Sequence, residues 1–371
     1  MRKLFLILLL IASLNIDAQF VTSFAKNVQT SQDEVVFYYL PRNVIKIEFT
    51  VEETAYYKGP YAEFATKLLG VTDFIEEDNV KFEIKSVDIQ EFTETDPNAV
   101  YCISTDEKSK EPMPNVILDD NGLLLAFGYD SIPTRLYQQC NSLIDNNICQ
   151  NERQDVTFIN ILEKEKETPD DDDEDEENGK KNVKKISKED LANIAADNIV
   201  KIRNAYFELI SGFNEVNYGN TTEYMSYNMK QLENEYISLF TGKVVKNTYK
   251  KTVYVTPEKN QSDASLNIAR LNDTNGVVDT SDKGEIIKIQ FDSRNSLANI
   301  NLTTPEKTES LTNKLIYRIP ANSDVKIVLG NSVIAQKQLP ISQFGIIKSI
   351  PVKNNKILFN PNTGQVISIV R

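Results

Sequence analysis

The chain of 371 residues contains no histidine. The commonest general base of enzymes is therefore missing, which excludes Ser-His-Asp and Cys-His catalysis. Zinc and iron sites that depend on histidine ligands are excluded for the same reason. Tryptophan is absent as well, which removes the best stacking surface for sugar rings, although 16 tyrosines remain.

Cysteine is scarce, with only Cys102, Cys140 and Cys149 in the chain. No two of them form a CxxC pair, so neither a four-thiolate zinc site nor a thioredoxin-like motif is indicated. In an oxidising compartment Cys140 and Cys149 would close a short loop as a disulfide, and three free thiols are the alternative. Phosphate-binding GxGxxG and GxxxxGK[ST] patterns are missing, and the acidic turns at residues 119–122 and 272–276 lack the ligand series of a calcium loop. We therefore predict neither a metal nor a cofactor.

Catalysis by paired carboxylates remains compatible with the composition. Two carboxylates hydrolyse glycosidic bonds without histidine, so a glycan-acting hydrolase is the alternative to a protein without catalytic activity. Because the chain contains 54 acidic residues, no single pair stands out, and we predict no catalytic residue.

The first 18 residues have the three parts of a secretory signal peptide. Arg2 and Lys3 supply the positive start, residues 4–14 form a short apolar stretch, and Ala18 precedes the expected cleavage before Gln19. No later segment approaches the roughly 20 apolar residues of a membrane-spanning helix. We expect an exported protein that resides in the periplasm, on the cell surface or in the medium.

The formal net charge is −13 at pH 7, and residues 170–177 alone contribute eight carboxylates. A net acidic chain without a basic stripe argues against nucleic acid and anionic membranes as partners. Four lysines follow the acidic run between residues 180 and 185, and such charged blocks usually stay solvated. We interpret residues 169–186 as a disordered linker.

Residues 19–168 have the pattern of an α+β domain. Residues 43–51 alternate, with Ile45, Ile47 and Phe49 on one face, as in a half-buried strand. Further strands are predicted at residues 35–40, 80–92, 100–104, 115–118 and 123–127, and a short helix is predicted at residues 60–69. We expect one helix on a mostly antiparallel sheet. Residues 156–162 fit either a short strand or an ordered loop.

Residues 187–242 are predicted to form a helical hairpin. Ser187 and Asp190 have the spacing of a capping box. Apolar residues then recur at helical spacing over residues 191–210 and again over residues 224–240, and Gly242 ends the second helix. We expect the two helices to lie antiparallel with their apolar faces on a neighbouring sheet. Binding of a partner by the exposed face is the alternative.

Residues 243–371 return to short strands. The predicted strands are residues 244–256, 286–291, 315–319, 325–329, 334–339, 344–352, 357–359 and 365–370. A turn with the sequence Asn-Pro-Asn-Thr-Gly separates the last two, and the spacing of the strands predicts a β-sandwich-like region.

Residues 39–47 and 317–327 resemble each other in sequence. A proline that follows a strand in both segments explains this similarity better than a true internal repeat.

Short motifs spread over nearly the whole expected mature chain support a family resemblance. They are Tyr39-Leu40-Pro41, residues 61–70, Gly122-Leu123-Leu124-Leu125, Leu239-Phe240-Thr241-Gly242, Pro257-Glu258-Lys259, Tyr317-Arg318-Ile319-Pro320, Gln343-Phe344-Gly345 and Pro361-Asn362-Thr363-Gly364. With these motifs the chain resembles the domain-of-unknown-function 4831 family, exported proteins of Gram-negative bacteria. The resemblance implies no activity and no catalytic residue, because none is assigned to that family.

The function that we expect is that of a non-catalytic binding or structural component of the cell envelope. The signal peptide, the absence of histidine and the sheet-rich layout all favour it over an enzyme. Its partner would be another envelope protein or a glycan.

Deleting residues 170–177 is expected to leave the fold nearly unchanged, because a solvated charged run buries no apolar surface. Thermal unfolding of the deletion variant, followed by circular dichroism, should give a melting temperature within about 2 °C of that of the parent chain. A large fall in melting temperature would show instead that the acidic run packs against the fold.

Overall fold

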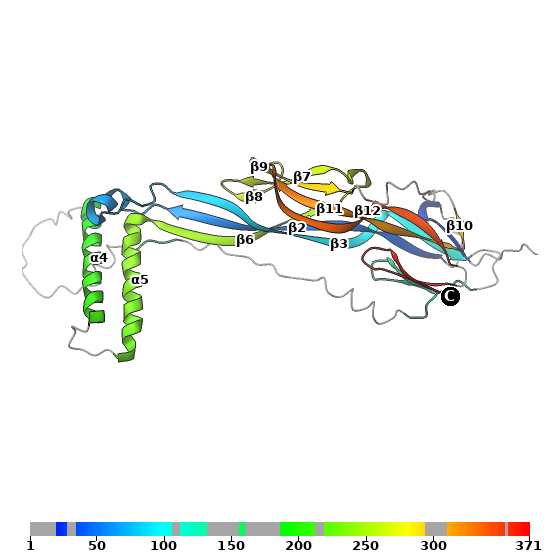
Figure 1. Cartoon of the computed structure of the whole chain (residues 1–371), viewed down its shortest axis with the longest axis horizontal. Helices are drawn as coiled ribbons and strands as arrows, with labels where there is room; N and C mark the ends of the chain where they lie inside the picture. Colours follow the sequence, from blue (N-terminus) through cyan, green and yellow to red (C-terminus); the bar gives the residue numbers. More distant parts are fainter. Residues whose placement is uncertain are drawn as a thin grey trace, which may run out of the picture.

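The computed structural model describes residues 20–27, 35–105, 112–131, 156–159, 186–211, 219–293, 310–352 and 355–371. Residues 1–18, Cys140, Cys149 and residues 170–177 lie outside these described residues, so the signal peptide, the disulfide and the acidic linker remain predictions. The molecule is elongated, with two helices at one end and three antiparallel sheets along its length (Figure 1).

Two very long strands form the axis of the molecule. β2 (Val35–Tyr57) and β3 (Asn79–Thr105) contain 23 and 27 residues and pair as an antiparallel hairpin. At a rise of about 3.3 Å per residue, β2 alone spans about 75 Å. The sheet around them, which we call sheet A, has the order β10-β1-β3-β2-β6. Its other strands are β1 (Phe20–Phe24), β6 (Lys243–Val255) and β10 (Leu311–Thr312).

A second long hairpin, formed by β11 (Lys314–Leu329) and β12 (Ser332–Pro351), packs on the first. It belongs to sheet C, which has the order β12-β11-β9-β7-β8. The shorter strands of sheet C are β7 (Ser265–Asn272), β8 (Gly276–Val278) and β9 (Glu285–Asp292).

Sheet B is small and lies near the end of the molecule away from the helices (Figure 1). Its order is β14-β13-β5-β4. The four strands are β4 (Val116–Leu118), β5 (Leu124–Phe127), β13 (Lys356–Phe359) and β14 (Val366–Val370). Short helical turns complete the described chain: η1 (Ala25–Asn27), η2 (Ala62–Phe64), η3 (Ala65–Leu69), η4 (Gly219–Thr221) and η5 (Lys259–Gln261).

Two hydrophobic cores follow one another along the long hairpins. The first lies between sheets A and C and contains Ile45, Ile47, Phe49, Val51, Ile287, Ile289, Phe291, Val325, Ile327 and Phe344. The second joins sheet B to the other ends of the same hairpins and contains Phe20, Tyr38, Leu40, Tyr101, Ile103, Phe127, Leu315, Ile357 and Phe359. The alternation predicted for residues 43–51 is confirmed, because its apolar face is buried in the first core.

The helices α4 (Lys188–Ser211) and α5 (Thr222–Thr241) lie side by side, crosswise to the long axis (Figure 1). The capping box is confirmed: the Asp190 N–H donates to the Ser187 hydroxyl at 3.1 Å, and the Ser187 N–H donates to the Asp190 carboxylate at 3.2 Å. Gly242, with a φ of +88°, ends α5 where the chain enters β6.

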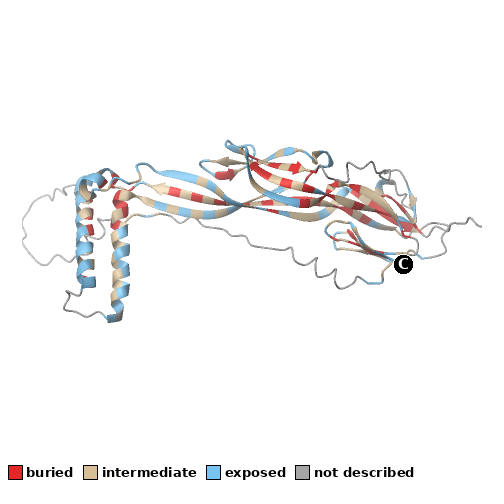
Figure 2. Cartoon of the chain, in the orientation of Figure 1, coloured by how far each residue is buried: buried red, intermediate tan, exposed pale blue. Residues whose placement is uncertain are grey.

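The helical hairpin packs on η2 and η3, not on the face of a sheet as expected. Tyr61 and Ala65 contact Ile199, Tyr236 and Phe240 in a third hydrophobic cluster. Buried residues of both helices gather where they meet these turns (Figure 2). The reason is geometric, because α5 continues directly into β6 and the hairpin therefore lies beyond the end of sheet A.

The strand-rich mixed fold with antiparallel sheets is confirmed. Its strands are longer than the sequence indicated, and one sheet combines strands from distant parts of the chain. β3 runs through both of the strands predicted at residues 80–92 and 100–104. Sheet A, expected within residues 19–168, also takes β6 and β10 from residues 243–371. Residues 156–159 form no strand, and Phe158 packs at the base of the helical hairpin. Within the described residues, no helix combines the length and apolarity that a bilayer crossing requires.

Candidate functional site

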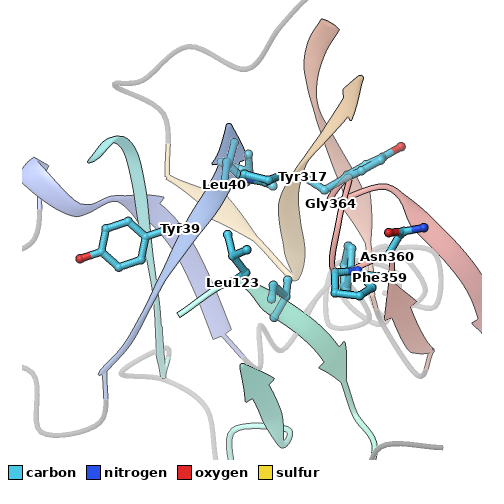
Figure 3. A pocket seen from close by; sticks show the side chains of 11 residues that line it. Tyr39, Leu40, Leu123, Tyr317, Phe359, Asn360 and Gly364 are labelled. Atoms are coloured by element: carbon cyan, nitrogen blue, oxygen red, sulfur yellow. The ribbon is translucent and has the colours of Figure 1, made fainter. Parts of the chain in front are cut away.

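The two cores meet at a junction where all three sheets come together. A cavity of about 10 Å³ lies there, which is room for about one water molecule. Its walls are mostly apolar: Tyr39, Leu40, Pro41, Leu123, Leu124, Ile316, Tyr317, Phe359, Asn360, Pro361 and Gly364 (Figure 3). Pockets that bind small molecules occupy about 300–1,000 Å³, so this cavity is too small for a substrate and is a gap in the packing between the sheets.

Close backbone contacts hold sheet B in the junction. The Tyr39 N–H donates to the Gly122 carbonyl at 2.9 Å, which ties β2 to the turn before β5. The turn between β13 and β14 lies on the ring of Pro41, so close to Gly364 that a Cβ at that position would collide with it. Gly364 also has a φ of +68°, which favours glycine. The Thr93 hydroxyl of β3 donates to the Asn362 carbonyl of the same turn.

A buried ion pair joins the two long hairpins. The Arg318 guanidinium of β11 donates to the Pro41 carbonyl of β2 at 2.5 Å and to the Asp96 carboxylate of β3 at 2.9 Å. Only 9% of the Arg318 side chain and 13% of the Asp96 side chain are exposed. Both Pro41 and Pro320 lie at register shifts in their strands, where the ladder of backbone hydrogen bonds is interrupted. The guanidinium therefore bridges the backbone of β2 and a carboxylate of β3 beside these interruptions.

Amide groups make a second link between the hairpins. The Asn43 N–H donates to the Gln343 side-chain carbonyl at 2.9 Å, and the Gln343 side-chain amide donates to the Asn43 carbonyl at 2.7 Å. The Asn43 side-chain carbonyl accepts from the Ser342 N–H at 2.7 Å. Gly345 lies two residues further on, against the Ile319 carbonyl, where a Cβ would not fit. These contacts fix the position of β12 of sheet C against β2 of sheet A.

The structure brings together most of the short motifs that suggested the family resemblance. Residues 39–41, 122–124, 317–320, 343–345 and 361–364 all lie at the three-sheet junction. Residues 61–70 and 239–242 meet at the base of the helical hairpin, where the Tyr61 N–H donates to the Leu239 carbonyl at 2.8 Å. The two similar segments at Pro41 and Pro320 occupy corresponding places in the two long hairpins. The motifs therefore lie where the three sheets meet one another and where the helical hairpin meets the turns η2 and η3.

A larger hollow of about 300 Å³ lies beside the junction, between β3 and the turn before β5. It is lined by Arg42, Thr93, Glu94, Thr95, Pro97 and Asn121, and the Arg42 guanidinium pairs with the Glu94 carboxylate at 3.1 Å. As lined by described residues, neither hollow contains the two carboxylates that glycoside hydrolysis requires. In the described part of the chain, no group of three or more Cys, Asp and Glu side chains is arranged to hold a metal ion.

Of the three cysteines, the structure describes Cys102 alone. It is buried in sheet A, and its thiol lies 3.2 Å from the Ser23 hydroxyl. Cys140 and Cys149 lie outside the described residues, so their disulfide stays a prediction.

The far ends of α4 and α5 expose large side chains, two of which, Ile210 and Tyr224, the helical pattern had assigned to the core. Ile210 is 56% exposed, Tyr224 is 70% exposed and Tyr227 is 61% exposed. The periodicity correctly predicted the helices, but Ile210 and Tyr224 were wrongly counted as buried. The physical reason is that η2 and η3 cover only the base of the hairpin (Figure 2).

Residues 34–367 match the model of one protein family, described as Domain of unknown function (DUF4831). The match spans most of the chain and includes every motif named above. No curated protein and no solved structure matches the chain.

Replacing Arg318 by methionine is expected to destabilise the fold by about 3–5 kcal/mol, because the Asp96 carboxylate would remain buried without its partner. Replacing Arg42 by methionine is the matched control, because its ion pair with Glu94 is more exposed (31% and 50% of the two side chains) and should contribute at most about 1 kcal/mol. Urea unfolding of both variants measures the difference. Equal losses of stability would contradict a special role for Arg318.

Glu91, next to the junction, is expected to make the stability of the fold depend on pH. One oxygen of its carboxylate is buried without a hydrogen-bond partner among the described residues. Burial raises the pKa of the Glu91 carboxyl above its ordinary value, and the Lys337 ammonium offsets part of the rise. A raised pKa means that the charged carboxylate destabilises the fold at neutral pH, and that this cost disappears as the pH falls through the raised pKa.

Replacing Glu91 by glutamine should therefore raise the melting temperature at pH 7, by roughly 2 °C for each kcal/mol of relieved cost. The difference from the parent chain should shrink as the pH is lowered towards 4, because the parent carboxyl becomes neutral as well. Glu77→Gln is the control, since Glu77 is exposed. A pH-independent difference would show that ionisation of Glu91 does not cause the effect.

Proposed function

We propose, on the premise that this chain belongs to the DUF4831 family, that it is a non-catalytic binding component of the cell envelope. The long sheets act as a spacer, and the helical hairpin is the binding element at one end of it. The chain is exported, as its first 18 residues indicate, and acts in the periplasm, on the cell surface or in the medium.

The observation that carries this proposal is the contrast between the two ends of the helical hairpin. The base is anchored: besides its apolar cluster, the Lys188 ammonium lies 2.9 Å from the Glu63 carboxylate, and the Lys243 ammonium lies 2.6 Å from the Glu235 carboxylate. The Arg203–Glu233 pair, at 2.5 Å, links the helices to each other further along. The far end, in contrast, exposes Tyr224 and Tyr227.

Tyrosine at such a place suits recognition of another protein. Its ring provides a large apolar contact with few rotatable bonds, while its hydroxyl finds hydrogen bonds at the rim, and tyrosine is enriched among residues that dominate binding energy. Because Tyr224 and Tyr227 are three residues apart on α5, both rings lie on one side of the helix. A helical surface of this kind fits a groove or a second helical pair on an envelope protein.

A catalytic role is not part of the proposal. Glycoside hydrolysis needs two carboxylates on either side of the bond, and the larger hollow has Glu94 as its one carboxylate, already paired with Arg42. The residues that converge at the three-sheet junction are used in packing and in hydrogen bonds between strands.

Replacing Tyr224 and Tyr227 together by serine should abolish cross-linking to the envelope partner, with at least about a tenfold loss of affinity once that partner is purified. The fold should remain intact, because both side chains are exposed. Tyr254→Ser is the matched control: Tyr254 is 65% exposed on β6, outside the hairpin, and its replacement should leave the cross-link unchanged.

Photo-cross-linking in living cells, followed by mass spectrometry, identifies the partner and compares the variants. Melting temperatures of the purified variants report on folding. An unchanged cross-link in the Tyr224 and Tyr227 variant would refute the hairpin as the binding element. Release of sugars from purified envelope glycan by the chain itself would refute the non-catalytic role.

A further inference from the structure

A second surface, far from the helical hairpin, has the properties of a pairing edge. β14 is the outermost strand of sheet B, with β13 on one side and no described strand on the other. Its side chains are apolar and poorly covered: Ile367 is 49% exposed, Ile369 is 52% exposed and Val370 is 47% exposed. An edge strand of this kind offers unpaired backbone groups together with apolar side chains, which favours addition of another strand.

Another edge strand of the same molecule shows how such an edge is protected. β6 is the outer strand of sheet A, and it carries Lys246, Lys250 and Lys251. These lysines pair with Glu52, Glu48 and Asp279 and remain 62%, 47% and 40% exposed. Charged lysines on an edge oppose the docking of a further strand. β14 has no charged residue and no proline, so its edge lacks this protection.

The sequence of β14 indicates that a second copy of the same strand fits its free edge. Val366-Ile367-Ser368-Ile369-Val370 reads the same in both directions. If two copies pair antiparallel about Ser368, isoleucine faces isoleucine, valine faces valine and the two serines face each other. Two-fold pairing requires a surface that complements itself, and a palindromic strand is the simplest such surface. Branched pairs of this kind favour cross-strand packing.

We infer that two copies of this chain pair through β14, antiparallel and centred on Ser368, to give one continuous sheet across both copies. The two copies would contribute four strands each, since sheet B has four. The inference does not depend on the helical hairpin and goes beyond the function proposed above.

The charges near β14 are compatible with this pairing. Arg371 of one copy lies opposite the neutral Gln365 of the other in this register. The two Arg371 residues are then six positions apart along the ladder, about 20 Å, which exceeds the screening length of about 8–10 Å at physiological salt. The turn at residues 360–364, which approaches the same end, contains no charged residue.

The size of the contact sets the expected strength. Five residues on each side bury less area than the 1,200–2,000 Å² or so of stable complexes, so the dimer should be weak. We expect it to form at tens to hundreds of micromolar, which corresponds to about 5–6 kcal/mol of binding free energy. The experiments use the expected mature chain, residues 19–371, which includes β14.

Cysteine cross-linking tests the register directly. Residues opposite each other in an antiparallel pair have Cα atoms about 4.5–5.5 Å apart, within the range that a disulfide bridges. Ser368→Cys should therefore form a covalent dimer under mild oxidation, at least about tenfold faster than the parent chain. Ile367→Cys alone should not, whereas a mixture of Ile367→Cys and Ile369→Cys chains should form the mixed dimer. The parent chain reports any background from Cys102, Cys140 and Cys149.

Sedimentation equilibrium of the parent chain and of two lysine variants provides the second test. Ile369→Lys should weaken the dimer at least about tenfold, because it places a charge in the pairing edge. Val333→Lys is the matched control: Val333 is 55% exposed on β12, in another sheet, and its replacement should leave the dimer unchanged. Melting temperatures of both variants confirm folding.

Three results would overturn the inference. The first is a parent chain that stays monomeric up to about 1 mM, where even weak pairs associate. The second is a Ser368→Cys cross-link no faster than that of the parent chain or of Ile367→Cys. The third is a Ser368→Cys cross-link in envelope extracts to a different protein in place of a second copy, which would assign the edge to another partner.

Discussion

The Arg318 guanidinium, held between the Pro41 carbonyl and the Asp96 carboxylate, is the contact on which the arrangement of the long hairpins depends. Each hairpin passes from one core to the next at a proline, and a proline donates no hydrogen bond to the ladder. The carbonyl of one of these prolines, Pro41, accepts from Arg318. A planar cation with several donors can satisfy this carbonyl and a carboxylate at once, which a lysine would do less well. The ion pair thereby ties the two long hairpins together where the two cores meet.

The sequence predicted local features well and long-range pairing poorly. The alternation at residues 43–51, the capping box at Ser187 and the stop at Gly242 each depend on neighbouring residues, and all three are confirmed. The pairing of β2 with β6 and of β5 with β13 could not be predicted, because a period of two assigns the face of a strand and not its neighbour. Helical periodicity likewise did not reveal that Ile210 and Tyr224 lie beyond the covering turns.

The three-sheet junction was harder to find from residue types alone. Asn43, Arg318 and Gln343 are common polar residues within strand patterns. Nothing in their spacing indicates that Asn43 meets Gln343 across 300 positions or that Arg318 meets Pro41 across 277. The signal that did exist was the order of short motifs and the similarity between residues 39–47 and 317–327. In the structure that similarity corresponds to a proline at the same place in each long hairpin. The exposed tyrosines of the helical hairpin carried no comparable signal.

Contacts between the beginning and the end of the chain have a consequence for when folding can occur. The Phe20 N–H donates to the Asn313 side chain, and the Tyr38 hydroxyl donates to the Ile316 carbonyl, across 293 and 278 positions. The core around the first strands therefore cannot form completely before residues beyond 310 are available. Contacts between residues so far apart in the sequence form slowly. During synthesis β1, β2 and β3 can pair with one another early, but their contacts with β10 and β11 form only after most of the chain has been made. With this topology the hydrophobic core at the end of the molecule becomes complete only after nearly the whole chain has been synthesised.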